Sequence, residues 1–174
     1  MAFDVKQAIV DRLLATKREN IDTVIDFMET NGFFTCNCNR HHHYYGGLAE
    51  HSWQTYLIAQ KQNSQNHLQC QGSSGRIDDS IAIAAFLHDL CNCSGMSHIR
   101  GHGRRSARIL KELGFKLTVE EFLAIRFHMS IHNKTTHHLY EQALCCKLRY
   151  VVHIADGKSA RLGKGWSVPD GYGA

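Results

Sequence analysis

Apolar residues recur at helical intervals along most of the chain, and no segment has the alternating pattern of paired strands. The first predicted helical segment runs from about Val5 to Glu29, with a candidate break near Asn20. Asn31-Gly32 ends it, because this pair is a common helix terminator. Further helices are predicted over about Leu48 to His67, Asp79 to Leu90, Arg104 to Leu113, Val119 to Met129 and Leu139 to Arg161.

Two of these segments carry additional information about the fold. The segment SIAIAAFLHDL is apolar on nearly every face, which is typical of a helix at the centre of a domain. Thr118 and Glu121 have the spacing of a capping box, which marks a helix start at Val119. The pattern therefore predicts an all-α protein, a bundle of about six helices.

The length and composition are those of one ordinary globular domain. The chain has 174 residues, of which 43% are hydrophobic and 21% charged. We expect a single domain over 1–174, with a core at about 34–161, an N-terminal helical segment at 1–31 and an irregular C-terminal arm at 163–174. No stretch approaches the roughly 18 apolar residues of a membrane span, and the start lacks the pattern of a secretory signal. A cytoplasmic location without a membrane partner is therefore expected.

Charge and cysteine content limit the chemistry. The formal net charge is +4, which suits an anionic substrate but is far from the dense basic stripe of a dedicated nucleic-acid binder. The seven cysteines are interpreted as reduced thiols. A zinc site formed by Cys36 and Cys38 with His41 to His43 is an alternative, but Cys-x-Cys is shorter than the usual zinc spacing.

The 13 histidines are the unusual feature of the composition, because histidine is the commonest metal ligand. His88-Asp89 ends the most apolar helix, where an imidazole and a carboxylate are costly to bury without partners. The alternative is that the helix has simply reached solvent there. His51 follows two glycines, and Asp156 lies inside an apolar helical run. Neutral imidazoles with carboxylates suit Zn, Mn, Fe and other borderline divalent metals.

Five segments, in this order, resemble a known family: HHHYYGGLAEHS, AAFLHDL, GHGRRSARIL, AIRFHMS and HIAD. Together they resemble the HD-domain superfamily of metal-dependent phosphohydrolases, and in particular a compact single-domain bacterial and phage subgroup. The first segment is similar to the HD domains of bacterial 3′→5′ exoribonucleases. The resemblance implies a helical bundle that holds one or two divalent transition-metal ions, which would be Mn, Fe, Ni, Zn or Co.

The resemblance also implies roles for individual residues. The first metal would be bound by His51, His88, Asp89 and Asp156, with Asp89 bridging to a second ion. His102 and His128 would bind that second metal or the substrate phosphate, and Asp89 and His128 are the candidate catalytic residues. His153 could orient a ligand from one helical turn before Asp156. The candidates for lining the pocket are His41, His42, Arg104, Lys158 and Arg161.

The implied function is hydrolysis of a phosphate ester, with a nucleotide as the expected substrate, by a metal-activated water. A nuclease or cyclic-nucleotide phosphodiesterase is the first alternative, so nucleic acid is a possible partner. The second alternative is a metal- or ligand-binding module without turnover. It is favoured by Asn92, which occupies a position where many relatives carry a lysine. An iron-dependent oxygenase is a further alternative. The sequence predicts no particular oligomeric state.

Overall fold

The computed structural model describes residues 3–38, 41–66, 77–94, 101–129 and 137–162, and within them every regular element is helical. The all-α prediction is confirmed. The predicted arm at 163–174 lies outside the described residues. The elements are α1 (Val5–Ala15), α2 (Ile21–Thr30), α3 (Gly47–Asn66), α4 (Ile77–Leu87), a 3₁₀ helix η1 (Leu90–Ser94), α5 (His102–Glu112), α6 (Val119–Arg126), α7 (His137–Cys145) and α8 (Lys147–Ser159).

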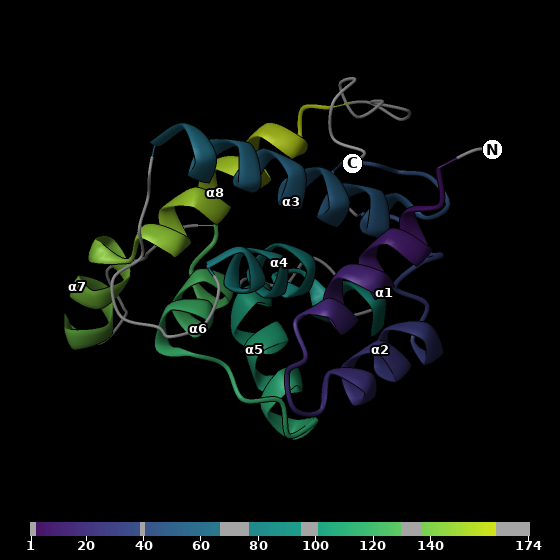
Figure 1. Ribbon diagram of the computed structural model, residues 1–174, viewed down its shortest axis with the longest axis horizontal. Helices are drawn as coiled ribbons and strands as arrows, with labels where there is room; N and C mark the ends of the chain where they lie inside the picture. The colour runs from purple at the N-terminus through teal and green to yellow at the C-terminus, as the bar shows by residue number, and fades with distance from the viewer. Residues whose placement is uncertain (1–2, 39–40, 67–76, 95–100, 130–136, 163–174) are drawn as a thin grey trace.

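Helix α4 forms the centre of the molecule. Every residue from Ser80 to Leu87 is buried, as the continuous apolar pattern predicts. Helices α1, α3, α6 and α8 all pack against it. In Figure 1, α3 and α8 lie together along one side of α4, while α5 and α6 lie on the opposite side. This arrangement brings segments distant in sequence to one end of α4.

The first helical segment is broken near Asn20, as predicted. Lys17 and Asn20 have positive φ angles of 52° and 63°, which lie outside the range of a right-handed α-helix. The Asn20 amide donates a hydrogen bond to the Gly114 carbonyl at 2.9 Å, and this contact favours the unusual backbone of the turn. The break lets α2 fold back along α1.

The last helical segment is also divided, and the prediction of one helix over 139–161 is wrong. Cys146 has extended backbone angles, φ −75° and ψ 107°, and acts as the N-cap of α8. Its sulfur accepts a hydrogen bond from the Arg149 amide at 3.4 Å. No glycine or proline marks this position, so the sequence pattern alone gave no reason to divide the helix.

Several helix ends differ from the predicted ones in a way that matters for the candidate site. Helix α4 ends at Leu87, so His88 and Asp89 lie in the turn after it instead of in its last turn. Helix α6 ends at Arg126, which places His128 in the bend that follows. The capping box of α6 is confirmed, with the Glu121 amide 3.2 Å from the Thr118 hydroxyl. None of the helices in the described part of the chain is long and apolar enough to cross a membrane.

Candidate metal centre

Four side chains from three segments meet at one end of α4. His51 comes from the first turns of α3, His88 and Asp89 from the turn after α4, and Asp156 from α8. The Nε2 atom of His51 lies 3.3 Å from His88 Nε2 and 3.2 Å from Asp156 Oδ1. His88 Nε2 lies 3.7 Å from Asp89 Oδ2. All four residues are buried, so the structure brings together the four residues expected to share the first metal.

A second group shares Asp89 with the first. His102 begins α5, His128 follows α6, and their Nε2 atoms are 2.8 Å apart. Both nitrogens face Asp89 Oδ1, at 3.4 Å and 3.5 Å. The two carboxylate oxygens of Asp89 therefore face different histidine groups, as a bridging ligand would.

Each fully buried histidine in the two groups is held through its Nδ1 atom. His88 Nδ1 lies 2.9 Å from the Ala85 carbonyl, and His128 Nδ1 lies 2.8 Å from the Ile125 carbonyl. A carbonyl can only accept, so each Nδ1 carries the proton and each Nε2 carries the lone pair. His51 Nδ1 contacts the Ser159 hydroxyl at 2.9 Å. This pattern of hydrogen bonds leaves Nε2 free to bind a metal.

The residues fit a pair of divalent ions on two grounds. Asp89 Oδ1 is buried and receives no hydrogen bond from the described residues, which is costly for a carboxylate unless a cation accompanies it. Ligand atoms about 2.0–2.1 Å from one ion lie about 3.0 Å apart in octahedral geometry and about 3.3–3.4 Å apart in tetrahedral geometry. The contacts of His51 Nε2, at 3.2 and 3.3 Å, and the His102–His128 separation of 2.8 Å are close to these values.

The protonation states also suit metal binding. Burial lowers the pKa of His88 to about 4, so its imidazole is neutral near pH 7. Burial opposes ionisation of Asp156, but the neighbouring imidazoles of His51 and His88 outweigh it and lower the pKa of Asp156 to about 2. The pKa of Asp89 is likewise held well below its usual range, by His88 and His128 against the effect of burial. The site therefore offers two anionic carboxylates beside the neutral imidazole of His88.

The expected pocket residues divide into two sets. His41 and His42 lie beside the first group, with ring centroids 4.4 Å and 5.5 Å from that of His51. Arg104, Lys158 and Arg161 are all exposed, so the structure does not bring them into the buried centre. Arg105 is half-buried, and its guanidinium interacts with the Cys91 thiol. Burial lowers the pKa of His102, and the charge of Arg105 contributes to this lowering. It is therefore the better-placed cation near the second group.

Two supporting residues were not predicted from the sequence. Ser159 is fully buried on α8, and its hydroxyl contacts His51 Nδ1. Gln54 lies on α3, and its side-chain oxygen contacts both Ser159 and His42. Gln54 lies three residues after His51 on α3, and Ser159 lies three residues after Asp156 on α8. At this spacing each residue is on the same helical face as the ligand candidate that precedes it. His153, expected to orient a ligand, instead contacts the backbone carbonyl of His128.

No cysteine in the described part of the chain contributes a ligand atom to these groups. Convergent groups of possible ligand atoms in the described residues consist of histidine and aspartate alone. Cys38 approaches His41, with Sγ 3.8 Å from Nε2, while His43 is exposed. A zinc site combining Cys36, Cys38 and His41 to His43 therefore finds no support.

A separate cavity of about 660 Å³ between α5, α6 and α7 is lined by residues such as Phe115, Phe122 and Leu139 and contains no residue of the centre.

Comparison with known families agrees with this geometry. A family model of the HD domain matches residues 48–160, more than half of the chain. The protein therefore belongs to the HD-domain family, whose members are in general metal-dependent phosphohydrolases. Searches of curated proteins and of solved structures found no match.

Proposed function

We propose that the protein binds two divalent transition-metal ions at this centre. His51, His88, Asp89 and Asp156 would hold the first ion, and Asp89, His102 and His128 the second. The observation that carries the proposal is the shared carboxylate, because Asp89 is buried between two groups of histidine nitrogens. A carboxylate can bridge two ions about 3.5–4 Å apart.

We infer that the centre hydrolyses a phosphate ester. Bound divalent ions supply a Lewis acid and a water of lowered pKa, the chemistry by which metal sites cleave such esters. The protein's own contribution is positional: the Nδ1 hydrogen bonds of His88 and His128 fix both rings, and the buried carboxylates balance the cationic charge. His128 would donate a proton to the leaving group only without a second ion, because one Nε2 cannot bind a metal and carry a proton.

We propose a nucleotide as the substrate. The net charge of +4 favours an anion, and exposed Arg104, Lys158 and Arg161 and half-buried Arg105 offer guanidinium and ammonium groups for phosphate. The same basic residues support the alternative of a nuclease or cyclic-nucleotide phosphodiesterase. A short oligonucleotide, a cyclic nucleotide and a nucleoside monophosphate therefore need to be compared directly.

The test is chromatographic analysis of the products that each of these three substrates gives with protein loaded with Mn, Fe, Co, Ni or Zn. Hydrolysis gives nucleoside and phosphate from the monophosphate, shorter nucleotides from the oligonucleotide and a linear monophosphate from the cyclic nucleotide. We expect hydrolysis of the monophosphate, with a loss of at least 100-fold in kcat for Asp89→Asn, which keeps the size of the side chain but removes its charge. His43→Ala, which replaces an exposed histidine, is the matched control and should keep full activity. Cleavage of the oligonucleotide or cyclic nucleotide alone would favour the alternative. If metal-loaded protein cleaved none of them, the third possibility, a binding module without turnover, would replace the proposal.

A further inference from the structure

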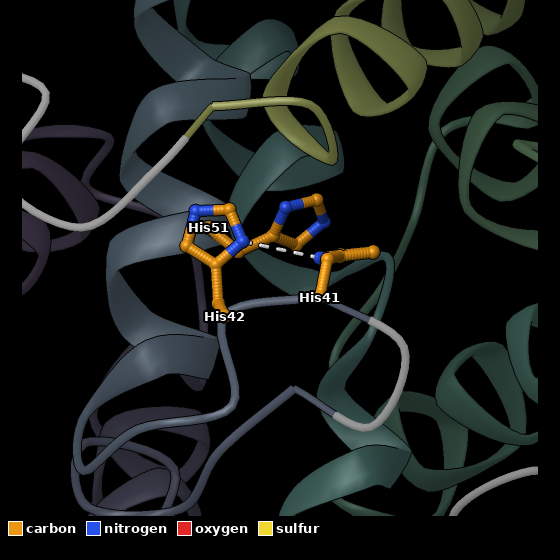
Figure 2. A group of neighbouring side chains, drawn as sticks. All are labelled: His41, His42 and His51. Carbon is orange, nitrogen blue, oxygen red and sulfur yellow. Dashed lines mark hydrogen bonds between the residues drawn. The ribbon is translucent and has the colours of Figure 1, made fainter.

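His41 and His42 form a pair of imidazoles that the two-ion centre does not use. Both belong to the loop before α3, and Figure 2 shows their rings converging beside His51. Ligand nitrogens of the three histidines all lie within 4.8 Å of one another. The Nδ1 atoms of His41 and His42 are 3.2 Å apart, the contact drawn as a dashed line in Figure 2.

The loop backbone holds His42 in a conformation that ordinary residues rarely adopt. Its φ angle is +55°, a left-handed value, and its carbonyl accepts hydrogen bonds from the amides of Tyr44 at 2.8 Å and Cys38 at 3.3 Å. A Cβ atom on Gly47 would lie 2.0 Å from the same carbonyl, so glycine is required there for α3 to begin against His42. The close approach of loop and helix fixes the position of the His42 ring.

Neighbouring side chains fix which nitrogen of His42 is free. The Gln54 amide nitrogen lies 3.3 Å from Glu50 Oε1, a pure acceptor, so the other end of the amide is the oxygen. That oxygen lies 2.9 Å from His42 Nε2, which must therefore carry the proton. The lone pair of neutral His42 is consequently on Nδ1, the atom that faces His41.

His51 cannot complete a site with this pair while it serves the centre. Its Nδ1 faces the Ser159 hydroxyl, and its Nε2 faces Asp156 Oδ1 and His88 Nε2. An ion between His41 and His42 would thus be additional to the ion at His51. The 3.2 Å separation of the two Nδ1 atoms nearly equals the 3.3 Å between His51 Nε2 and His88 Nε2. It is close to the separation of about 3.3 Å expected for two nitrogens on one tetrahedral ion.

We propose that His41 Nδ1 and His42 Nδ1 bind an additional divalent transition-metal ion at the edge of the centre. Two imidazoles suit a borderline ion such as Zn²⁺, Co²⁺ or Ni²⁺, with water in the remaining positions. Because the protein supplies only two ligands, this ion is held more weakly than the ions at the carboxylates. His41 is half-buried and gives the site contact with solvent.

The test counts bound metal and does not depend on turnover. Wild type, His41→Ala, His42→Ala and the control His43→Ala are equilibrated with Co²⁺ or Zn²⁺, and bound ions are counted by elemental mass spectrometry after equilibrium dialysis. We expect His41→Ala and His42→Ala each to bind one equivalent less than wild type, and His43→Ala to bind the same number. Circular dichroism checks that each variant is folded. If His42→Ala unfolds because this side chain is buried, His41→Ala still tests the proposal, because His41 is only half-buried.

A second variant separates this proposal from the two-ion centre. Folded His88→Ala/Asp89→Ala protein should lose the central ions and retain one weakly bound equivalent. Equal metal counts in wild type and folded His41→Ala would overturn the proposal, and the pair would then be joined by an N–H···N hydrogen bond alone. Absence of any bound ion from the folded double variant would overturn it as well. Failure of the central site would appear differently, as a double variant that binds as much metal as wild type.

Discussion

Each buried histidine of the centre depends on a partner that fixes its tautomer. Backbone carbonyls do this for His88 and His128, whereas His51 relies on a side chain, Ser159. The Ser159 hydroxyl also lies 3.1 Å from the His51 carbonyl and can donate to it while accepting from Nδ1. His51 is therefore the ligand candidate most sensitive to a single substitution elsewhere.

Ser159→Ala tests this dependence. Removing the hydroxyl leaves His51 Nδ1 without its partner, and loss of such a partner typically lowers metal affinity by about 10–100-fold. We expect a drop of that size for the first ion, measured by competition with a chromophoric chelator. Ser64→Ala, which removes an exposed hydroxyl bonded to the Lys61 carbonyl, is the control and should leave the affinity unchanged. Equal affinities in the two variants would contradict the role of Ser159.

At the scale of elements, the centre forms because helix ends converge on it. His88 and Asp89 follow α4, His128 follows α6, His102 begins α5 and His51 lies near the start of α3. Gly103 allows α5 and α6 to approach closely, since a Cβ there would lie 2.4 Å from the Ile125 carbonyl. That carbonyl is also the acceptor for His128 Nδ1, so the same contact positions both histidines of the second group.

Gly103→Ala should therefore push α5 away from α6. We expect the free energy of unfolding to fall by about 1–3 kcal/mol, the usual cost of overpacking, measured by urea denaturation of metal-free protein. The variant should also lose the second ion, because the contact between α5 and α6 positions His102 and His128. The control is Gly157→Ala in α8, where a Cβ meets open space and should stabilise the helix by up to about 1 kcal/mol. A Gly103→Ala variant as stable as wild type, with both ions, would refute this account of the helix contact.

The elements were largely predictable from the sequence, but their ends and junctions were less so. Helical periodicity and the capping box at Thr118 are local properties, and both predictions were confirmed. The division at Cys146 depends on packing and on a thiol N-cap that no turn residue announces. Ser159 and Gln54 likewise become recognisable only once α3 and α8 are side by side, because serine and glutamine at those positions are ordinary helix residues.

At the scale of the whole molecule, the N-terminal segment is joined to the rest through buried polar contacts. Arg18, between α1 and α2, pairs with both carboxylate oxygens of Glu121 at 2.7 and 3.1 Å. Glu121 is fully buried and also accepts from Ser80 at the start of α4. Arg12 of α1 binds Asp79 at 2.9 Å. We propose on this basis that α1 and α2 belong to the same domain as the HD core.

Arg18→Ala tests the proposal of one domain. It leaves the Glu121 carboxylate buried without its cation, and breaking such a pair costs about 3–5 kcal/mol. We expect a loss near the lower value, because the Arg18 side chain is 26% exposed. Arg108→Ala removes an exposed pair with Glu112 and should change stability by at most about 0.5 kcal/mol. Two separate urea transitions, or equal stability of the two variants, would contradict the single-domain proposal.

The most direct test of the central claim is metal content. Elemental mass spectrometry on untagged wild type and on His88→Ala/Asp89→Ala, with folding checked by circular dichroism, counts the ions without assuming a substrate. We predict two tightly bound equivalents of a divalent transition metal in wild type, both lost from the variant because Asp89 serves both groups. Folded wild type that binds none of Mn, Fe, Co, Ni or Zn would contradict the account, and the buried histidines would then have a structural role only.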